Sequence, residues 1–267
     1  MKFLPIASCD LDEIKHLQPE DWSDIIPDIE FYIRSGFCRP IKACVDDRIA
    51  GIGVTIVYDT TAWLAHIIVD ATYRNRGIGL GIVSELLQGL RGSPVTTCML
   101  TATELGKPVY VKAGFRAVSE YIFMNREKSG IDYPVSPNIV EYTAQYKAQI
   151  LQMDRSITAE NRERLLSPHL EGSLVCLKNG MVQGYFIPGL KEGPVIAQNP
   201  EAAMELMKLK FSGAGRIVLP SENIAGIEFL KQNGYAETTT KGTRMVLGEN
   251  PDWQPEKIYS RIGGNFG

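Results

Sequence analysis

The chain has 267 residues, more than the ~100–150 residues of a common single domain, so we expect two domains. Hydrophobic residues make up 44% of the chain and charged residues 22%, which is typical of a protein that buries a core. The formal net charge is -3 and no basic cluster stands out, so nucleic acid is not an expected partner.

The cysteines and histidines predict no metal or redox centre. The five cysteines are odd in number, no pair has CxxC spacing, and the three histidines lie far apart in the sequence. Residues 1–8 lack the apolar segment of a signal peptide, and no stretch reaches the ~18 apolar residues of a membrane span. We therefore expect a cytoplasmic protein with no membrane partner. The residues concerned are Cys9, Cys38, Cys44, Cys98, Cys176, His16, His66 and His169.

The first half of the chain alternates strand and helix patterns, as a mixed α/β unit does. A nearly apolar run over residues 63–69 predicts a strand in the middle of a sheet. Apolar residues at helical spacing predict an amphipathic helix over 77–90. The other expected elements are short helices within 9–33, a hairpin of 40–45 with 49–58, a strand over 95–100, a helix over 105–112 and a strand over 115–125.

A linker over residues 128–138 is expected from Ser129-Gly130 and two prolines. The pattern then restarts, which divides the chain into domains 1–127 and 139–267. Asn179-Gly180 marks a hairpin turn, and residues 253–267 show no periodicity. The expected elements are helix over 141–166, a hairpin of 174–177 with 183–187, strands over 195–197, 216–219 and 244–247, and helices over 200–210 and 225–232.

The restart is an internal repeat. Residues 103–115 align without a gap on residues 223–235, and both segments end in glycine followed by an aromatic residue, Gly114-Phe115 and Gly234-Tyr235. Each places a strand before and a helix within the segment. Two tandem copies of one fold are therefore expected.

A glycine-rich turn follows the strand that ends at Val69. Its sequence is Arg74-Asn75-Arg76-Gly77-Ile78-Gly79, and it opens the helix over 77–90. The first N–H groups of a helix have no intrahelical partner, and glycine lets an anion approach them closely. The turn therefore predicts a diphosphate site, with a glycine-rich helix start made for packing as the alternative. Gly51-Ile52-Gly53 indicates instead a bulge or a close contact within a strand.

Two motifs together resemble those of the GNAT superfamily, the coenzyme A-dependent N-acetyltransferases. Arg74-x-x-Gly77-x-Gly79 is similar to the family's Gln/Arg-x-x-Gly-x-Gly/Ala signature. The segment Tyr110-x-Lys112-x-Gly114-Phe115 is similar to its second signature and follows in the expected order. The resemblance covers about residues 1–127. It implies an α/β (α+β) fold of two tandem domains, each a mixed, mostly antiparallel sheet flanked by helices, with acetyl-CoA as co-substrate.

The resemblance also implies roles for individual residues. A free backbone N–H on the strand before the turn would polarise the acetyl carbonyl. Tyr110 would protonate the coenzyme thiolate, with an ordinary half-buried helix tyrosine as the alternative. Thr103 stands where the family usually has an asparagine that contacts the coenzyme arm. The expected coenzyme-binding residues are Ile67, Ile68, Val69, Arg74, Asn75, Arg76, Gly77, Ile78, Gly79, Leu80 and Thr103.

The sequence leaves two routes open for the proton of the amine. His66 is a candidate general base by residue type, but it lies on a strand and its side chain could face the packed side. Water could take the proton instead. The acceptor pocket is expected to include Trp22, Phe31 and Tyr32, which could equally be core residues.

The second copy lacks the chemical groups of the first. The segment Gln198-Asn199-Pro200-Glu201-Ala202-Ala203 stands in place of the glycine-rich turn, and Leu230 stands in place of Tyr110. The second copy is therefore expected to be a degenerate, inactive domain that completes the acceptor site or has a regulatory role. Asp154-Arg155 and Arg162 are similar to the start of the carboxyl-terminal domain in some two-domain members of the family.

These observations predict an N-acetyltransferase in which a primary amine attacks acetyl-CoA directly. The acceptor is expected to be a small molecule or a peptide, and the protein a monomer or a homodimer. One alternative is a non-catalytic acyl-CoA sensor, and another is a module that binds a different phosphorylated ligand at the same turn.

Overall fold

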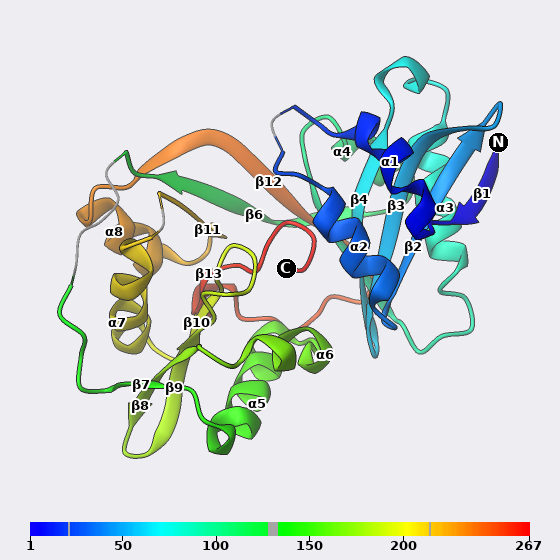
Figure 1. The fold of residues 1–267 in the computed structure, drawn as a ribbon. Helices are drawn as coiled ribbons and strands as arrows, with labels where there is room; N and C mark the ends of the chain where they lie inside the picture. The colour runs from blue at the N-terminus through cyan, green and yellow to red at the C-terminus, as the bar shows by residue number, and fades with distance from the viewer. Residues whose placement is uncertain (21, 128–132, 214) are drawn as a thin grey trace. The chain divides into compact units, whose positions relative to one another are not determined.

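The computed structural model describes residues 1–20, 22–127, 133–213 and 215–267 (Figure 1). The chain forms two compact units. Unit 1 consists of Met1–Ala117, Met245–Glu249 and Phe266, and unit 2 of Val118–Arg244, Asn250–Asn265 and Gly267. Within the described ranges, no helix is both long enough and apolar enough to cross a membrane.

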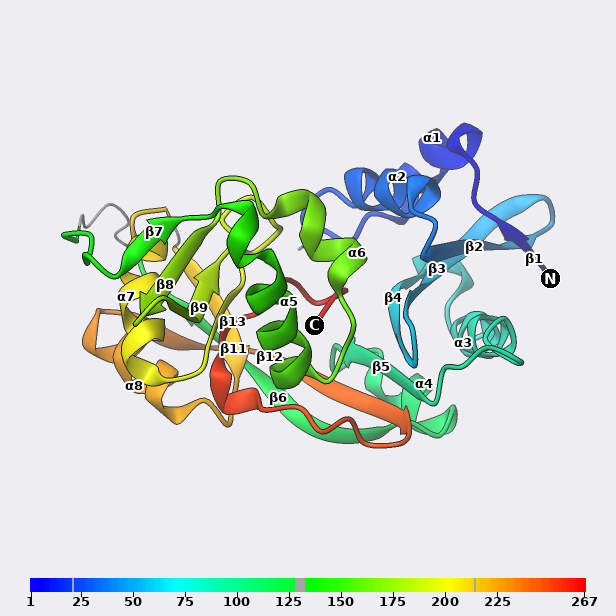
Figure 2. The same cartoon turned by 90° about the horizontal axis from the view of Figure 1, so that it is seen from below.

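Unit 1 is a twisted sheet with helices on both faces, and Figure 2 shows α1 and α2 on one side of β2 to β4 and α3 on the other. A two-residue turn at Asp46 and Asp47 joins β2 to β3, and both residues have positive φ, as such hairpin turns require. The elements are β1 (Lys2–Pro5), η1 (Ser8–Asp10), α1 (Leu11–Ile14), η2 (Lys15–Leu17), α2 (Ile26–Arg34), β2 (Cys38–Val45), β3 (Arg48–Tyr58), β4 (Thr61–Val69), η3 (Ala71–Tyr73), α3 (Ile78–Gln88), β5 (Thr97–Ala102) and α4 (Lys107–Lys112).

Unit 2 contains a second sheet, in the order β13-β10-β9-β8-β7, on which α7 packs. Asn179 and Gly180, both with positive φ, form the predicted hairpin turn between β8 and β9. The elements that begin after α4 are β6 (Arg116–Asn125), β7 (Ile139–Glu141), η4 (Ala144–Tyr146), α5 (Lys147–Thr158), α6 (Glu163–Leu166), η5 (Ser167–His169), β8 (Leu174–Lys178), β9 (Met181–Phe186), β10 (Val195–Ala197), α7 (Pro200–Phe211), β11 (Arg216–Pro220), α8 (Ile224–Gln232), β12 (Ala236–Gly248), η6 (Pro255–Lys257) and β13 (Ile258–Ser260).

The internal repeat is confirmed at the level of single hydrogen bonds. A glycine with positive φ follows two residues after the last residue of α4 and of α8, with φ of 93° at Gly114 and 82° at Gly234. The next residue then donates back into the helix: Phe115 N–H to the Tyr110 carbonyl and Tyr235 N–H to the Leu230 carbonyl, each at 3.0 Å. Only glycine adopts this conformation without strain, so both copies end the helix in the same way.

Two strands are shared between the units. Residues 236–244 of β12 belong to unit 2 and residues 245–248 to unit 1, and β6 likewise begins in unit 1 and continues in unit 2. The larger sheet has the order β1-β2-β3-β4-β5-β12-β6-β11. The last strand of the first copy therefore pairs with β11 of the second copy, and β12 of the second copy follows β5 of the first. Domain boundaries at 127 and 139 stay a prediction.

Two sequence expectations in the second half are wrong. The helix expected over 141–166 is instead β7, η4, α5 and α6, because Ala159 adopts positive φ (60°) and ends α5. The final strand begins at Ala236 rather than near 244, and its first residues are mostly exposed and so show no apolar alternation. Residues 253–267, which had no periodicity, contain η6 and β13. Of the expected linker, 128–132 lie outside the described residues, and 133–138 form neither helix nor strand.

Candidate active site

The turn between β4 and α3 leaves the start of the helix open. Gly77 is the N-cap with φ of 78°, and it offers no side chain to the amides that follow. Gly81 N–H donates to the Gly77 carbonyl at 2.9 Å, which begins the helical hydrogen bonding. Among the described residues, no side chain accepts from the amides of Ile78, Gly79 or Leu80. These N–H groups are therefore available to an anion at the positive end of the helix.

The three glycines of this segment are present for different reasons. Gly77 is needed for its positive φ. At Gly81 a Cβ would lie 2.8 Å from Met1 Cε and 3.1 Å from Phe3 Cζ, so these side-chain tips would have to shift. At Gly79 neither reason applies: a Cβ would meet Val69 and Val109 at 3.7–4.0 Å, which is ordinary van der Waals contact. The fold does not require glycine at position 79, so the free space beside its backbone is open to a ligand.

Two arginines add positive charge beside the open amides. Arg74 donates from Nε to the Val69 carbonyl at 3.3 Å. The Arg76 guanidinium lies 5.2 Å from the centre of the Tyr73 ring. Both arginines and Asn75 are exposed, and Asn75 has a φ of 62° that bends the chain into the turn. Backbone amides, helix dipole and guanidinium groups together suit a diphosphate.

Strand β4 carries a β-bulge in its middle. Ala65 pairs with Val54 and Ile68 with Ile52, so His66 and Ile67 together lie opposite Gly53. His66 has a φ of 47°, which a non-glycine residue rarely adopts. A Cβ at Gly53 would lie 2.6 Å from Ile82 of α3, so the expectation of a bulge and a close contact around Gly51-Ile52-Gly53 is confirmed.

Beyond the bulge, one edge of β4 has no partner strand in the part of the chain that the structure describes. β4 pairs with β5 only over Thr61 to Trp63, and its neighbours in the sheet are β3 and β5. Asp70 N–H donates to the Ala50 carbonyl of β3, and backbone groups alternate in direction along a strand. The Ile67 and Val69 amides therefore face the opposite edge. Ile68 differs from these two, because its backbone faces β3 and its side chain is buried.

Tyr110 lies on α4, and the preceding residue, Val109, lies beside Gly79 of α3. Its side chain is buried, and burial raises the pKa of the phenol to about 12. Gly106 makes room for it, since a Cβ there would lie 3.0 Å from Tyr110 Cε2. Thr103 accepts a hydrogen bond from Gly106 N–H at 3.2 Å and keeps its own O–H to donate. At neutral pH, Tyr110 is a protonated phenol and so a proton donor.

His66 extends from the bulge toward α2. Its Nδ1 lies 2.9 Å from the Tyr32 hydroxyl and its Nε2 lies 3.7 Å from an Asp28 carboxylate oxygen. The edge of the Trp22 ring packs against the imidazole. Burial lowers the pKa of His66 to about 4, so the ring is neutral at pH 7. Sequence reasoning missed Asp28, because only the folding of α2 against β4 brings it near His66.

The aromatic residues expected to line the acceptor pocket differ in exposure. Trp22 is 39% exposed, whereas Tyr32 is fully buried. Phe31 packs edge-on against Phe37 and Phe266, with ring centres 6.0 and 5.8 Å apart. Tyr32 is therefore a core residue, whereas Phe31 is half-buried and Trp22 is the most exposed of the three rings.

The helix that follows β10 in the second copy is capped by the protein itself. Asn199 accepts from Ala202 N–H through its side chain at 3.0 Å, and Pro200 occupies the first turn. The aligned position of Tyr110 is Leu230, which is fully buried. The anion cradle and the phenol of the first copy have no counterpart at these positions.

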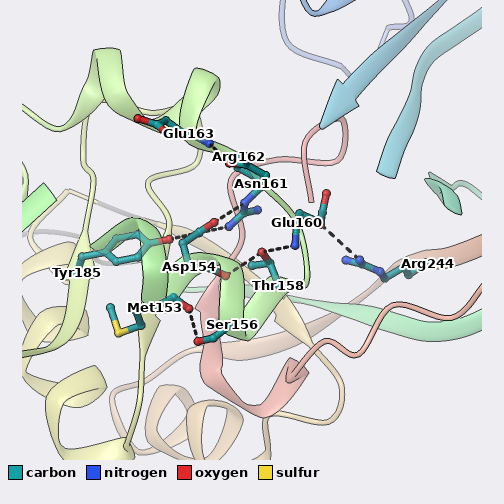
Figure 3. A network of polar contacts seen from close by, with 10 residues as sticks. All are labelled: Met153, Asp154, Ser156, Thr158, Glu160, Asn161, Arg162, Glu163, Tyr185 and Arg244. Carbon is teal, nitrogen blue, oxygen red and sulfur yellow. Dashed lines mark hydrogen bonds and ion pairs between the residues drawn. The ribbon is translucent and has the colours of Figure 1, made fainter. Parts of the chain in front are cut away.

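A buried polar network holds α5 and α6 of unit 2 (Figure 3). Arg162 binds both carboxylate oxygens of Asp154, at 2.6 and 3.1 Å, and Tyr185 donates its hydroxyl to the same carboxylate. Glu160 lies 3.7 Å from Arg244, whose guanidinium lies 3.9 Å from the centre of the Trp253 ring. Because the buried Asp154 carboxylate accepts hydrogen bonds from both Arg162 and Tyr185, we assign the Asp154–Arg162 pair a structural role in this unit.

Comparisons with known proteins identify the family of both copies. A family model described as an acetyltransferase (GNAT) domain matches residues 11–133, and another with the same description matches residues 150–260. The chain is 25% identical over 207 residues to the uncharacterized N-acetyltransferase YitH of Bacillus subtilis (strain 168), a match that covers 71% of each chain.

Two solved structures share the fold over nearly the whole chain. A Pyrococcus horikoshii protein described as an acetyltransferase has a TM-score of 0.81 at 18% identity, and the match covers 100% of this chain and 95% of that one. A GCN5-related N-acetyltransferase from Sphaerobacter thermophilus has a TM-score of 0.65 at 13% identity, with coverage of 92% and 95%. The expected fold class, two mixed and mostly antiparallel domains flanked by helices, is confirmed.

Proposed function

Since the chain belongs to the GNAT acetyltransferase superfamily and carries two of its domains in tandem, we propose that the first copy transfers an acetyl group from acetyl-CoA to a primary amine. The observation that carries this proposal is the start of α3. Its first amides have no side-chain acceptor among the described residues. In addition, residue 79 is a glycine although the surrounding protein has room for a methyl group there, so the missing side chain leaves space beside the amides.

Binding begins with the diphosphate of the coenzyme. The amides of Ile78, Gly79 and Leu80 donate to its oxygens, and Arg74 and Arg76 neutralise its charge. The amide-bearing arm then follows the unpaired edge of β4, where the backbone groups of Ile67 and Val69 face outward. The hydroxyl of Thr103 remains able to donate to the same arm.

The chemistry needs a polarised carbonyl and two proton transfers. Acetyl-CoA supplies the activated acetyl group. The amine nitrogen forms a bond to the acetyl carbon, and an outward-facing amide of β4 stabilises the negative charge that develops on the oxygen. As the carbon–sulfur bond breaks, Tyr110 donates its phenolic proton to the sulfur. The phenol is the weaker acid, so the transfer is favoured only while the thiolate is also desolvated.

The proton of the amine passes to His66. Burial keeps the imidazole neutral, so one of its two ring nitrogens carries a lone pair rather than a proton at physiological pH. Its basicity is low, and the Asp28 carboxylate 3.7 Å from Nε2 offsets part of the cost of charging it. Transfer follows attack on the carbonyl, when the nitrogen has become more acidic. Loss of this proton to water is the alternative route.

Calorimetry with coenzyme A and a thiol-release screen test the proposal together. The screen uses polyamines, amino acids, aminoglycosides and peptides as acceptors. We expect binding of acetyl-CoA and thiol release with at least one amine class. Binding without thiol release across the panel would favour the non-catalytic sensor, and binding of nucleotides in preference to coenzyme A would favour a different phosphorylated ligand.

A further inference from the structure

The last strand of the chain lies between two strands of the second copy. β13 pairs antiparallel with β10, with Val195 opposite Ser260 and Ile196 opposite Ile258. Immediately after β13, Arg261 N–H donates to the Val218 carbonyl of β11 at 3.0 Å. β13 is thus bonded to β10 along its length and to β11 at its end.

In the internal repeat, the position of β13 between β10 and β11 corresponds to the gap between β4 and β5 in the first copy. β10 leads into α7 as β4 leads into α3, and β11 leads into α8 as β5 leads into α4. In the first copy, β4 and β5 separate after Trp63, and the amides of Ile67 and Val69 face the gap. In the second copy, the gap between the equivalent strands holds β13.

A pair of aligned residues shows the correspondence at the atomic level. Asn223 aligns with Thr103, and each accepts a hydrogen bond from the backbone N–H of the glycine three residues further on: Asn223 from Gly226 at 2.8 Å, and Thr103 from Gly106 at 3.2 Å. Asn223 is fully buried and uses its remaining donor, Nδ2, on the Ile258 carbonyl at 2.9 Å. The second copy therefore directs a side-chain amide at a peptide carbonyl of β13.

Little space remains around the strand. Ile258, Tyr259 and Ser260 are all buried. The cavity between the starts of α7 and α8 and the segment 256–259 has a volume of about 250 Å³, below the ~300–1,000 Å³ of small-molecule sites. At the start of α7 the Asn199 side chain already accepts from Ala202 N–H, and at the strand end of the groove β13 pairs with β10.

We propose that the second copy binds a peptide strand of its own chain, Ile258–Ser260, in the groove that the first copy uses for the amide-bearing arm of the coenzyme. The assignment of the first groove rests on the proposed function. The coenzyme arm carries secondary amides in series, so an extended peptide offers the same donors and acceptors to a strand edge. Because the strand is tethered, its effective concentration is high and a free ligand competes poorly. The chain should therefore hold one coenzyme site, not two.

Hydrogen exchange and calorimetry on the full chain test this proposal. We expect one equivalent of coenzyme A per chain, slow exchange of the amides at 258–261 without ligand, and ligand-induced protection at Ile67, Val69 and 78–80 but not at 195–197. The variant Asn223→Thr keeps an oxygen to cap α8 but removes the donor to Ile258. It should speed exchange at 258–261 about five- to tenfold, as loss of one hydrogen bond implies, with coenzyme affinity unchanged.

The aligned variant Thr103→Ala is the matched control, and it should weaken coenzyme binding without changing exchange at 258–261. Two bound equivalents, coenzyme protection of 195–197, or fast exchange of 258–261 in the unmodified chain would each overturn the proposal. If coenzyme A does not bind at all, the proposed acetyltransferase function fails. The exchange rates at 258–261 then still decide whether the strand occupies its groove.

Discussion

Replacing Gly79 with alanine should raise stability and weaken coenzyme binding at the same time. The new Cβ would meet Val69 and Val109 at 3.7–4.0 Å, so the folded chain accepts it without displacement. Alanine is favoured over glycine within a helix by about 0.5–1 kcal/mol. At this first-turn position, we expect the free energy of unfolding to rise by up to that amount.

The same methyl group would stand beside the amides that we assign to the diphosphate. Loss of one or two hydrogen bonds to a charged group costs about 1.5–3 kcal/mol each. Since about 1.4 kcal/mol corresponds to a tenfold change in affinity, we expect Gly79→Ala to weaken coenzyme A binding by at least about tenfold. Denaturant unfolding and calorimetry measure the two effects on one preparation.

Gly89 at the other end of α3 provides the control. A Cβ there would meet the Leu86 and Glu85 carbonyls at 3.5 and 3.6 Å, again without a clash, and its φ is -63°. Gly89→Ala should leave coenzyme affinity unchanged. If Gly79→Ala binds coenzyme A as tightly as the unmodified chain, the diphosphate does not lie on the start of α3 and the assignment is wrong.

Four further outcomes follow from the structure. Tyr110→Phe should lower kcat by about 10²–10⁴-fold with coenzyme affinity nearly unchanged; an equal loss of affinity would show that Tyr110 binds rather than donates. The folded-state pKa of His66, about 4, lies below its unfolded value of about 6.5. The unfolded chain therefore binds the extra proton, and stability should be level above pH 6.5 and fall by roughly 3 kcal/mol down to pH 4; His66→Gln should flatten that slope in pH-dependent unfolding. Met245→Ala removes a fully buried side chain from the core of unit 1 and should destabilise the protein by about 2–5 kcal/mol in denaturant unfolding; a change under 1 kcal/mol would contradict its place in that core. Asp154→Ala leaves Arg162 buried without its carboxylate and should cost about 3–5 kcal/mol, whereas removal of the exposed Asp12–Lys15 pair should have little effect.

Local signals in the sequence identified most elements and the turn at the site. Apolar residues at helical spacing predicted α3, and Asn179-Gly180 predicted the turn between β8 and β9. The repeat located α4 and α8 with the glycine that ends each helix. All these features depend on residues within a few positions of one another, so a single sequence is enough to reveal them.

The tertiary structure decided which strands lie side by side. The sharing of β6 and β12 between the units could not be foreseen, because much of β12 is exposed and lacks apolar alternation. Strand pairing depends on which edges are open after the rest of the chain has folded. A short, aperiodic segment such as Ile258–Ser260 could fill a groove only once β10 and β11 had formed it.

The candidate site also has one part that the sequence predicted and one part that only the folded structure revealed. Residues 74–79 of the proposed diphosphate turn are contiguous, so the order of arginine and glycine in the sequence was enough to predict an anion site. The bulge at His66, the approach of Asp28 and the open edge of β4 bring together residues from α2, β3 and β4. Such contacts join residues far apart in the chain, and only the packing of helices on a twisted sheet determines them.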